Sequence, residues 1–389
     1  MERSTDRILT THAGSLPRPE DLAQLHIDRV DAKPVDEQAF ETRVQEAVDE
    51  VVAKQVDAGV AVVSDGEMSK YGYIEYIGER MDGYGAPRDM KDMGYYIKSL
   101  TEFPELLIDT YKNAHIKLPV CEGPLSYKQA GSQLVARDIR NFQRALNKHA
   151  VTEAFIPAAS PGVVASFCPN EYYPSYEEYV MGLAEALNTE YRAITDAGFL
   201  LQIDSPDLAF LSDFHTWMEP EIEKRGFRAI QELHVEAINH ALQGIPADKA
   251  RLHLCWANGM YPHTHDWPVR EVLDVAMKAN VAAVNLEGAN PAHAHEWEIF
   301  KDFPLPDDKV IVPGVIDTKS QVLENPRLVA QRILQYANLV GQERVIAGTD
   351  CGFGTFVGVL MVHPKTTWLK LKSLAEGAAI ATDELTKRR

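Results

Sequence analysis

Short apolar runs alternate with long amphipathic segments along this chain of 389 residues. The runs, many of them rich in β-branched residues, cover residues 8–15, 60–65, 154–160, 199–204, 251–255, 282–287, 309–316 and 344–350. Helix-like segments lie between them, for example 35–58, 176–196 and 326–339. Strands that alternate with helices form a parallel sheet, which is either closed as a barrel or open and doubly wound.

The polar residues at the ends of these runs favour the closed barrel. They recur at or just after the C-terminal end of most runs: Ser15, Glu67, Asp204, Cys255, Glu287, Asp317 and Cys351. A barrel gathers all such ends at one mouth, whereas an open sheet gathers only those beside its switch point. We therefore predict an α/β fold, a single (β/α)8 TIM barrel that forms one domain over residues 1–389. A further short run at 118–123 makes nine candidates for eight strands, so we expect one of the nine to lie outside the main cycle.

Composition and charge exclude several classes of partner. The chain is 45% hydrophobic and carries a formal net charge of -18, which repels phosphate backbones and anionic lipids. It has no apolar run near the ~18 residues of a membrane span and no signal-peptide pattern at its start. Its four cysteines are too few for a disulfide scaffold. We expect a cytoplasmic protein without nucleic-acid or membrane partners, and a homo-oligomer is left open.

A histidine and a cysteine stand two residues apart in the run 251–255. Side chains at positions i and i+2 of a strand share a face, so His253 and Cys255 can hold one object together. Another strand-like run ends just before Cys351. One nitrogen and two sulfur ligands most often bind zinc. The motif alone also fits a buried histidine beside an unrelated core cysteine, because cysteine is so often buried.

A fourth ligand is expected from another strand end, and Glu287 is the first ionisable residue that the run 282–287 brings to the mouth. An oxygen ligand is displaced more readily than sulfur or nitrogen, so this set resembles a catalytic zinc site with one exchangeable position. A free thiol, with a pKa of about 8.5, is mostly protonated at neutral pH, and zinc removes that proton. The set therefore predicts activation of a substrate thiol for attack on an electrophilic carbon.

Two histidine pairs follow strand ends, His263 with His265 and His293 with His295. Loop histidines more often form hydrogen bonds than bind metals. Either pair could line the mouth, and we count His263 and His265 among the predicted substrate-binding residues.

With these ligands in view, the sequence resembles the catalytic barrel of cobalamin-independent methionine synthase. It is more similar still to the short, single-barrel relatives that include epoxyalkane:coenzyme M transferase. The resemblance runs from about residue 10 to residue 354. It is carried in order and spacing by 11–17 (THAGSLP), 65–67 (DGE), 202–204 (QID), 253–256 (HLCW), 313–317 (PGVID) and 349–353 (TDCGF).

The resemblance implies a binding site for an amino acid. Gly14 and Ser15 would hold the carboxylate of homocysteine, while Glu67 and Asp204 would bind its amino group. Backbone amides and a hydroxyl suit an anion, and two carboxylates suit an ammonium. Taken alone, Gly14 and Ser15 would equally fit a plain turn, and the two acids would fit solvated strand ends.

The sequence also departs from the synthase pattern. The synthase uses a histidine two residues after the matching aspartate as its proton donor, whereas here Asp317 is followed by Lys319 at that place. With Glu287, these are the predicted catalytic residues. The Arg-Cys folate segment has no clear counterpart before residues 118–124, the synthase's tryptophan is replaced near Ala130, and its N-terminal barrel is missing. Zinc and thiol activation carry over, while methylfolate as the donor stays open.

These observations predict a zinc-dependent S-alkyltransferase, similar to 5-methyltetrahydropteroyltriglutamate–homocysteine S-methyltransferase. Its partners would be a small-molecule thiol such as homocysteine, activated as a zinc thiolate, and an alkyl donor. The donor could be a methylfolate, a methylated corrinoid protein or a sulfonium.

Two alternatives stay open. In the first, a thiol such as coenzyme M adds to an epoxide, and Arg18 serves the sulfonate of that thiol. Glu67 and Asp204 argue mildly against it, because they would repel a bare sulfonate. In the second, the chain is a non-catalytic zinc-binding accessory protein, which the polar strand ends beyond the four ligands disfavour, although fold alone does not fix function.

Overall fold

The computed structural model describes residues 1–106 and 116–388 and is built around one parallel sheet. Its strands, in spatial order, are β1 (Leu9–Thr10), β14 (Ile346–Thr349), β13 (Val310–Ile316), β12 (Ala283–Leu286), β11 (Ala250–His253), β9 (Leu200–Asp204), β8 (Glu153–Ala159) and β2 (Val62–Ser64). The first and last strands of this order are joined by the amide of Ala61, which donates to the carbonyl of Thr10 at 3.2 Å. The sheet is thereby nearly closed into a TIM-like barrel, and the predicted α/β barrel is confirmed.

All eight predicted runs contain a strand of this sheet. The run that lies outside it is the one at 118–123, which contributes to two short antiparallel pairs, β4 (Arg88–Asp89) with β6 (Lys117–Leu118) and β3 (Met81–Tyr84) with β7 (Cys121–Tyr127). A third pair joins β5 (Tyr96–Ile97) to β10 (Phe214–His215).

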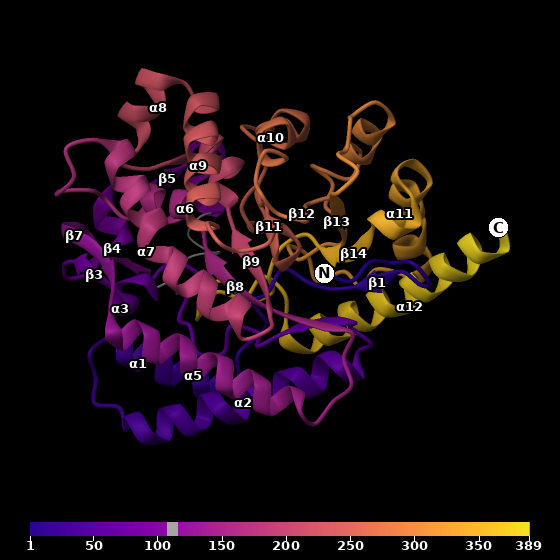
Figure 1. The fold of residues 1–389 in the computed structure, drawn as a ribbon, viewed down its shortest axis with the longest axis horizontal. Coiled ribbons are helices and arrows are strands. Elements are labelled where there is room, and N and C mark those ends of the chain that lie inside the picture. Colours follow the sequence, from indigo (N-terminus) through magenta and orange to yellow (C-terminus); the bar gives the residue numbers. More distant parts are fainter. Residues whose placement is uncertain (107–115, 389) are drawn as a thin grey trace.

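Helices surround the barrel, with α2 and α5 along its lower side and α11 and α12 at the right in Figure 1. Their bounds are α1 (Glu20–Val30), α2 (Glu37–Asp57), α3 (Ile77–Arg80), α5 (Gln129–Leu146), α6 (Pro161–Phe167), α7 (Tyr176–Asp196), α8 (Glu219–Arg225), α9 (Phe227–Ala241), α10 (Val269–Ala276), α11 (Pro326–Val340) and α12 (Pro364–Arg388). The segments expected at 35–58, 176–196 and 326–339 are confirmed as α2, α7 and α11. No described helix has the length and apolarity that a membrane crossing requires.

The sequence marks several of these helices at their first residues. Asp36, Ser160, Ser175 and Asn325 each accept a hydrogen bond from a backbone N–H in the first turn of the helix that follows. Such side chains satisfy donors that have no partner within the helix. Proline follows Ser160 and Asn325, at a position where its missing N–H costs nothing.

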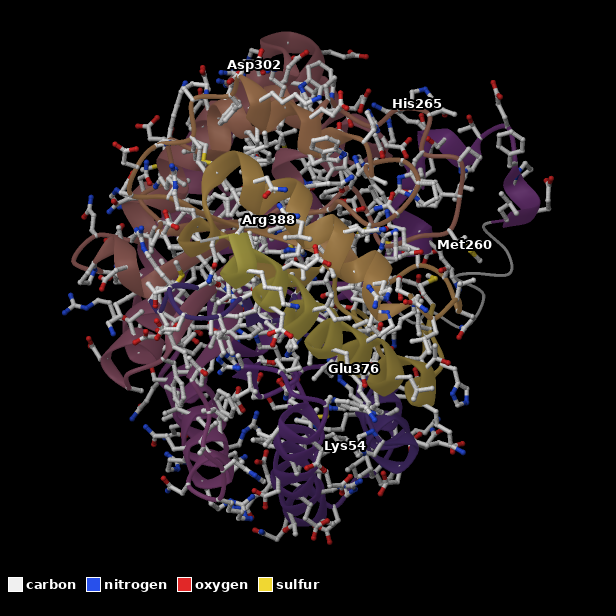
Figure 2. The ribbon with its side chains drawn as sticks, turned by 90° about the vertical axis from the view of Figure 1, so that its right-hand side faces the viewer. Lys54, Met260, His265, Asp302, Glu376 and Arg388 are labelled. Carbon is white, nitrogen blue, oxygen red and sulfur yellow. The ribbon has the colours of Figure 1, made fainter. Side chains whose placement is uncertain are left out.

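The last helix, α12, lies along the outside of the barrel, with Glu376 and Arg388 labelled in Figure 2. It packs mainly against α11 and also reaches α2, where the ammonium of Lys54 lies 5.7 Å from the ring centre of Trp368. The apolar core fills the space between the strands and this layer of helices, with fully buried side chains such as Val52, Leu187 and Ile238.

The buried Arg251 side chain forms hydrogen bonds to residues on β9 and just after β1. The Arg251 guanidinium donates to Gln202 Oε1 at 2.9 Å and to the carbonyl of His12 at 3.1 Å, and it stacks on Phe155. The Gln202 amide in turn donates to the carbonyl of Ala13 and to Asp204 Oδ1. Polar contacts inside the barrel therefore fix the turn after β1 and the end of β9.

Two buried histidines should make stability depend on pH. Burial lowers the pKa of His12 to about 4 and that of His26 to about 3. The neutral ring of His12 is well satisfied, because Nδ1 accepts from the amide of Gly14 and Nε2 faces Gln55 Oε1 at 2.8 Å. At pH values below 6.5, the ordinary pKa of histidine, His12 is protonated in the unfolded chain but stays neutral in the folded chain down to about pH 4.

We therefore expect the free energy of unfolding to fall as the pH drops from about 6.5 to about 4. His12 alone should contribute roughly 2–3 kcal/mol of this loss. The measurement is urea unfolding at neutral and acidic pH for the wild type and for His12→Gln, which lacks the titrating ring. An equally steep loss in both proteins would contradict the assignment.

Candidate active site

Three side chains converge at the C-terminal ends of β11 and β14. His253 is the last residue of β11, Cys255 follows two residues later, and Cys351 lies two residues beyond β14. All three are buried, and their ligand atoms lie within 4.8 Å of one another. The Cys255 thiol donates to Cys351 Sγ at 3.4 Å. The structure thus brings together three of the four predicted metal ligands.

The electrostatics of this cluster suit a metal ion. The hydrogen bond from Cys255 lowers the pKa of Cys351 to about 5, while the same contact and burial raise the pKa of Cys255. His253 Nδ1 is buried and has no hydrogen-bond partner among the described residues. One imidazole and two thiols are a donor set that zinc prefers. The buried ring nitrogen of His253 without a hydrogen-bond partner agrees with this role. The residues present therefore fit a zinc ion.

Glu287, the fourth predicted ligand, lies beside this cluster and not within it. Its carboxylate accepts from the amide of Trp256 at 2.8 Å, from Asn290 Nδ2 at 2.7 Å and from Lys319 Nζ at 2.8 Å. Burial raises the pKa of Glu287, but the charges of Lys319 and His293, together with the hydrogen bonds from Lys319 and the Trp256 amide, outweigh this effect and lower the pKa. The group is therefore a carboxylate with three donors around it.

The other two predicted catalytic residues lie on the same side of the barrel. Lys319 is buried and its ammonium is held by Glu287. Asp317 follows β13 and accepts from the amide of Lys319 at 2.8 Å, so it shapes the turn that carries the lysine. Their catalytic role stays a prediction.

The turn after β1 packs Ser15 against the loop that follows Cys351. Gly14 has a φ of 117°, a conformation that favours glycine, and a Cβ there would lie 2.8 Å from Pro157. The carbonyl of Ser15 accepts from the amide of Phe353, and a Cβ on Gly352 would lie 1.9 Å from Ser15 Oγ. The turn and the loop after β14 therefore pack tightly together.

The Arg18 side chain stabilises the turn after β1 and the loop after β14, because it donates hydrogen bonds to the carbonyls of Gly354 and Glu67. It does not line the cavity at the barrel mouth.

Two acids lie near the cluster and line the same cavity. Asp204 is the last residue of β9 and pairs in register with His253, and Glu67 follows β2. Burial raises the pKa of Glu67 to about 7 and that of Asp204 to about 6. Glu67 has a φ of 59°, which is strained for a residue with a side chain, and its buried Oε2 has no described partner. An approaching ammonium would satisfy both acids.

A cavity of about 450 Å³ joins these groups. Ser15, Glu67, Asp204, His253, Cys255 and Cys351 line one part of it. Most of the remaining wall is apolar and includes the aromatic residues Tyr73, Tyr95, Tyr96, Phe167, Phe210, Phe214, Phe353 and Phe356. The cavity can therefore hold a small polar substrate beside a larger apolar group.

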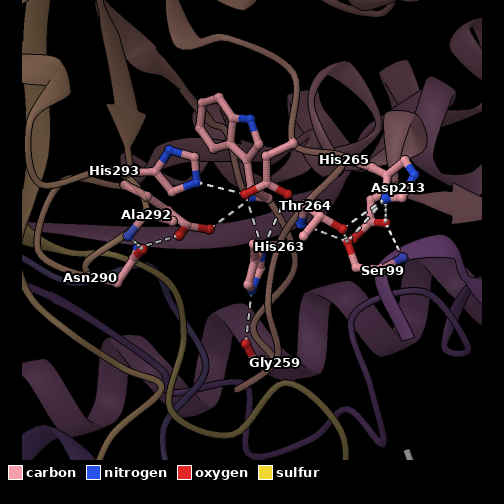
Figure 3. Close-up of polar contacts among 12 residues, drawn as sticks. Ser99, Asp213, Gly259, His263, Thr264, His265, Asn290, Ala292 and His293 are labelled. Atoms are coloured by element: carbon pink, nitrogen blue, oxygen red, sulfur yellow. Dashed lines mark hydrogen bonds and ion pairs between the residues drawn. The ribbon is translucent and has the colours of Figure 1, made fainter. Parts of the chain in front are cut away.

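Three of these histidines, His263, His265 and His293, lie in a separate polar cluster, shown in Figure 3. His263 Nδ1 and His293 Nε2 both face Asp266 Oδ2 at 3.0 Å, and His293 Nδ1 faces Glu296. His265 lies near Ser99 and Asp213. None of the four predicted histidines lines the cavity, although His263 Nε2 lies 3.5 Å from Lys319 Nζ. Substrate binding by His263 and His265 stays a prediction.

Sequence reasoning missed several residues that shape the site. Asp350 accepts from the amides of Gly288, Ala289 and Asn290, and so it fixes the loop that carries Glu287. The sequence feature that could have identified Asp350 is its position directly before Cys351. Lys70 is buried close to Asp65 and Glu67, with its ammonium on the carbonyl of Pro157 at 2.6 Å. Nothing in the local sequence marks it.

The fold and the site together define an α/β barrel with a thiol–imidazole cluster at its mouth. The model of the cobalamin-independent synthase catalytic domain matches residues 8–129. Methionine synthase of Sulfolobus acidocaldarius is 25% identical over 97% of this chain and 94% of its own length, and that of Sulfurisphaera tokodaii is 26% identical over 97% and 93%. The chain is thus similar to the cobalamin-independent methionine synthases over nearly its whole length.

Solved structures agree on the fold. A B12-independent methionine synthase from a Shewanella species, in complex with selenomethionine, superposes with a TM-score of 0.73 at 20% identity and covers 98% of this chain and 99% of its own. A protein from Listeria monocytogenes described as a B12-independent methionine synthase gives 0.65 at 19% identity, over 96% and 98%.

Proposed function

We propose that this protein is a zinc-dependent transferase that moves a methyl group to the thiol of homocysteine. The observation that carries the proposal is the convergence of His253, Cys255 and Cys351 with the acids Glu67 and Asp204 on one cavity. The methionine synthases to which the chain is similar support the same reading.

Some of these residues would bind the amino acid, and the others would activate its thiol. Glu67 and Asp204 would bind the ammonium of the amino acid, and the turn at Gly14 and Ser15 would hold its carboxylate. His253, Cys255 and Cys351 would hold zinc, which when bound supplies a substrate thiol in its deprotonated, nucleophilic form. Glu287 lies next to the cluster, and hydrogen bonds from the Lys319 ammonium and the Trp256 amide stabilise its negative charge.

The acid pair also separates this proposal from the addition of coenzyme M to an epoxide. A sulfonate would meet two carboxylates at the end of the cavity where the thiol must lie. Arg18, the cation considered for that sulfonate, is already bonded to two backbone carbonyls. The amino-acid thiol is therefore the better match.

The test combines metal analysis with product detection. Zinc-loaded protein should bind about one zinc ion and convert homocysteine to methionine, detected by mass spectrometry, with at least one methyl donor. Donors to be offered are methylfolate, methylcobalamin and a methyl sulfonium. Coenzyme M with a small epoxide serves as the competing reaction. Protein without zinc, or one that alkylates only coenzyme M, would refute the proposal.

Replacing Asp204 with asparagine tests how the thiol is recognised. We expect KM for homocysteine to rise about ten- to hundredfold, because a buried charge-assisted hydrogen bond is lost. The matched ligand is 4-mercaptobutanoate, which lacks only the ammonium group, and its binding should change little. An equal loss for both ligands would show that Asp204 does not contact the ammonium.

A further inference from the structure

A buried lysine lies next to the acids of the proposed amino-acid site. Lys70 is buried, and its side chain does not line the cavity. Its ammonium donates to the carbonyl of Pro157 at 2.6 Å and lies 4.3 Å from the ring centre of Tyr76. A buried ammonium is costly unless opposite charges lie nearby. The carboxylates close to Lys70 are therefore the groups on which its charge acts.

Three acids of the site are affected by this charge. Burial raises the pKa of Asp65, Glu67 and Asp204, and the Lys70 ammonium opposes the rise in all three. In Glu67 it is the largest opposing effect, and the pKa is raised to about 7. Arg18 also lowers the pKa of Glu67, whereas Asp204 and Asp65 raise it. Without Lys70, Glu67 would be mostly protonated at neutral pH and a poor partner for an ammonium.

The same lysine contacts both halves of the amino-acid site. Its amide donates to the carbonyl of Glu67 at 3.1 Å, which closes the turn that carries this acid. Its ammonium holds Pro157, and a Cβ on Gly14 would lie 2.8 Å from Pro157 Cγ. The same Cβ would lie 3.1 Å from Glu67 Oε1. Lys70 thus bonds to the turn of Glu67 and to the proline that packs against the turn of Gly14.

We propose that Lys70 is a positioning residue for the amino-acid thiol, because it keeps Glu67 in the carboxylate form and fixes Pro157 against the turn of Gly14. This role rests on the proposed function and does not require contact with the substrate. With the substrate bound, Lys70, Arg18 and the substrate ammonium balance the three acids. A thiol without an ammonium would leave one buried acid uncompensated, which is costly. Lys70 thereby makes the site select thiols that carry an amino group.

The preference for homocysteine over 4-mercaptobutanoate measures this role. Both ligands carry a thiol and a carboxylate, so the ratio of their dissociation constants, measured calorimetrically with zinc-loaded protein, cancels the pH dependence that these groups share. In the wild type the preference should rise between about pH 6 and about pH 8.5 with a midpoint near about 7, as Glu67 loses its proton. Lys70→Met should lower the preference about five- to fiftyfold at about pH 7 and move the midpoint to about pH 8 or above.

Further variants separate the charge of Lys70 from its shape. Lys70→Arg keeps the positive charge and should retain most of the preference and the wild-type midpoint. Lys70→Gln keeps an N–H donor without the charge, so its midpoint should move as in Lys70→Met, and it provides the comparison if Lys70→Met does not fold. In a Glu67→Gln background, Lys70→Met should no longer move the midpoint, because the titrating acid is absent.

The outcomes distinguish this role from the proposed function. An unchanged midpoint in both Lys70→Met and Lys70→Gln would overturn the role, even if both variants bound homocysteine more weakly. A wild-type preference that does not depend on pH would overturn it as well. In either case the preference for homocysteine would leave the proposed function intact. Equal binding of the two thiols to the wild type would instead refute the proposed amino-acid recognition, and the role of Lys70 with it.

Discussion

Cys351→Ser is expected to lower zinc affinity and homocysteine methylation by at least about a hundredfold, a larger loss than the ten- to hundredfold typical of residues that only support a metal ligand. A serine hydroxyl stays protonated where a thiolate would bind, so the cluster would keep one sulfur and one nitrogen. The change also removes the partner of the Cys255 thiol, 3.4 Å away. Zinc content after dialysis and methionine formation are the two measurements.

Cys121→Ser is the matched control for this variant. Cys121 is also a free, buried cysteine, but its thiol donates to the carbonyl of Gly123 and lies outside the metal cluster. A serine hydroxyl can make the same hydrogen bond, so zinc content and activity should persist. Full zinc binding and undiminished methylation in Cys351→Ser would contradict the assigned site, whatever the control shows.

The barrel could be predicted because its information is local. Each strand is an apolar run of a few residues bounded by turn residues, and the long helices α2, α7 and α11 carry their own capping residues. The first and last residues of the strands were harder to predict from the sequence. The run 8–15 was expected to be one strand, but β1 ends at Thr10, because the next residues form the turn of Gly14 and Ser15. That turn is held by contacts with the loop after β14, which no local pattern reveals.

The site was predictable only in part for a similar reason. The i, i+2 spacing of His253 and Cys255 and the strand-end position of Cys351 sufficed to bring three ligands together. The direction of a side chain at a strand end depends on its neighbours, and Glu287 turns toward Lys319, Asn290 and the amide of Trp256. The aromatic residues that line the cavity come from α6, β10 and several loops, so their convergence follows from the fold and not from any motif.

Arg80→Met should give the largest loss of stability among the substitutions considered. Arg80 ends α3 and donates to Asp138 on α5 and to Glu190 on α7, each at 2.5 Å. The three side chains are only 4%, 3% and 0% exposed. Breaking a buried ion pair by removing one partner costs about 3–5 kcal/mol, because the remaining charge stays buried without compensation.

The loss should fall mainly on Glu190. Asp138 retains two hydrogen bonds from Arg137, whereas Glu190 would keep the hydroxyl of Tyr127 at 2.7 Å as its described hydrogen-bond donor. For a chain of this length, the expected loss corresponds to a melting temperature lower by about 4–6 °C. The variant Arg80→Met, Glu190→Gln should recover part of this loss, because it removes the stranded charge as well.

Arg43→Met is the control for the loss of an arginine as such. Arg43 makes comparable ion pairs with Asp21 and Glu50, but both acids are largely exposed, so its removal should cost at most about 1 kcal/mol. Differential scanning calorimetry of the three variants and the wild type provides the comparison. If Arg80→Met melted like Arg43→Met, the contacts among α3, α5 and α7 would have to hold through packing alone, and the buried triad would contribute no net stability.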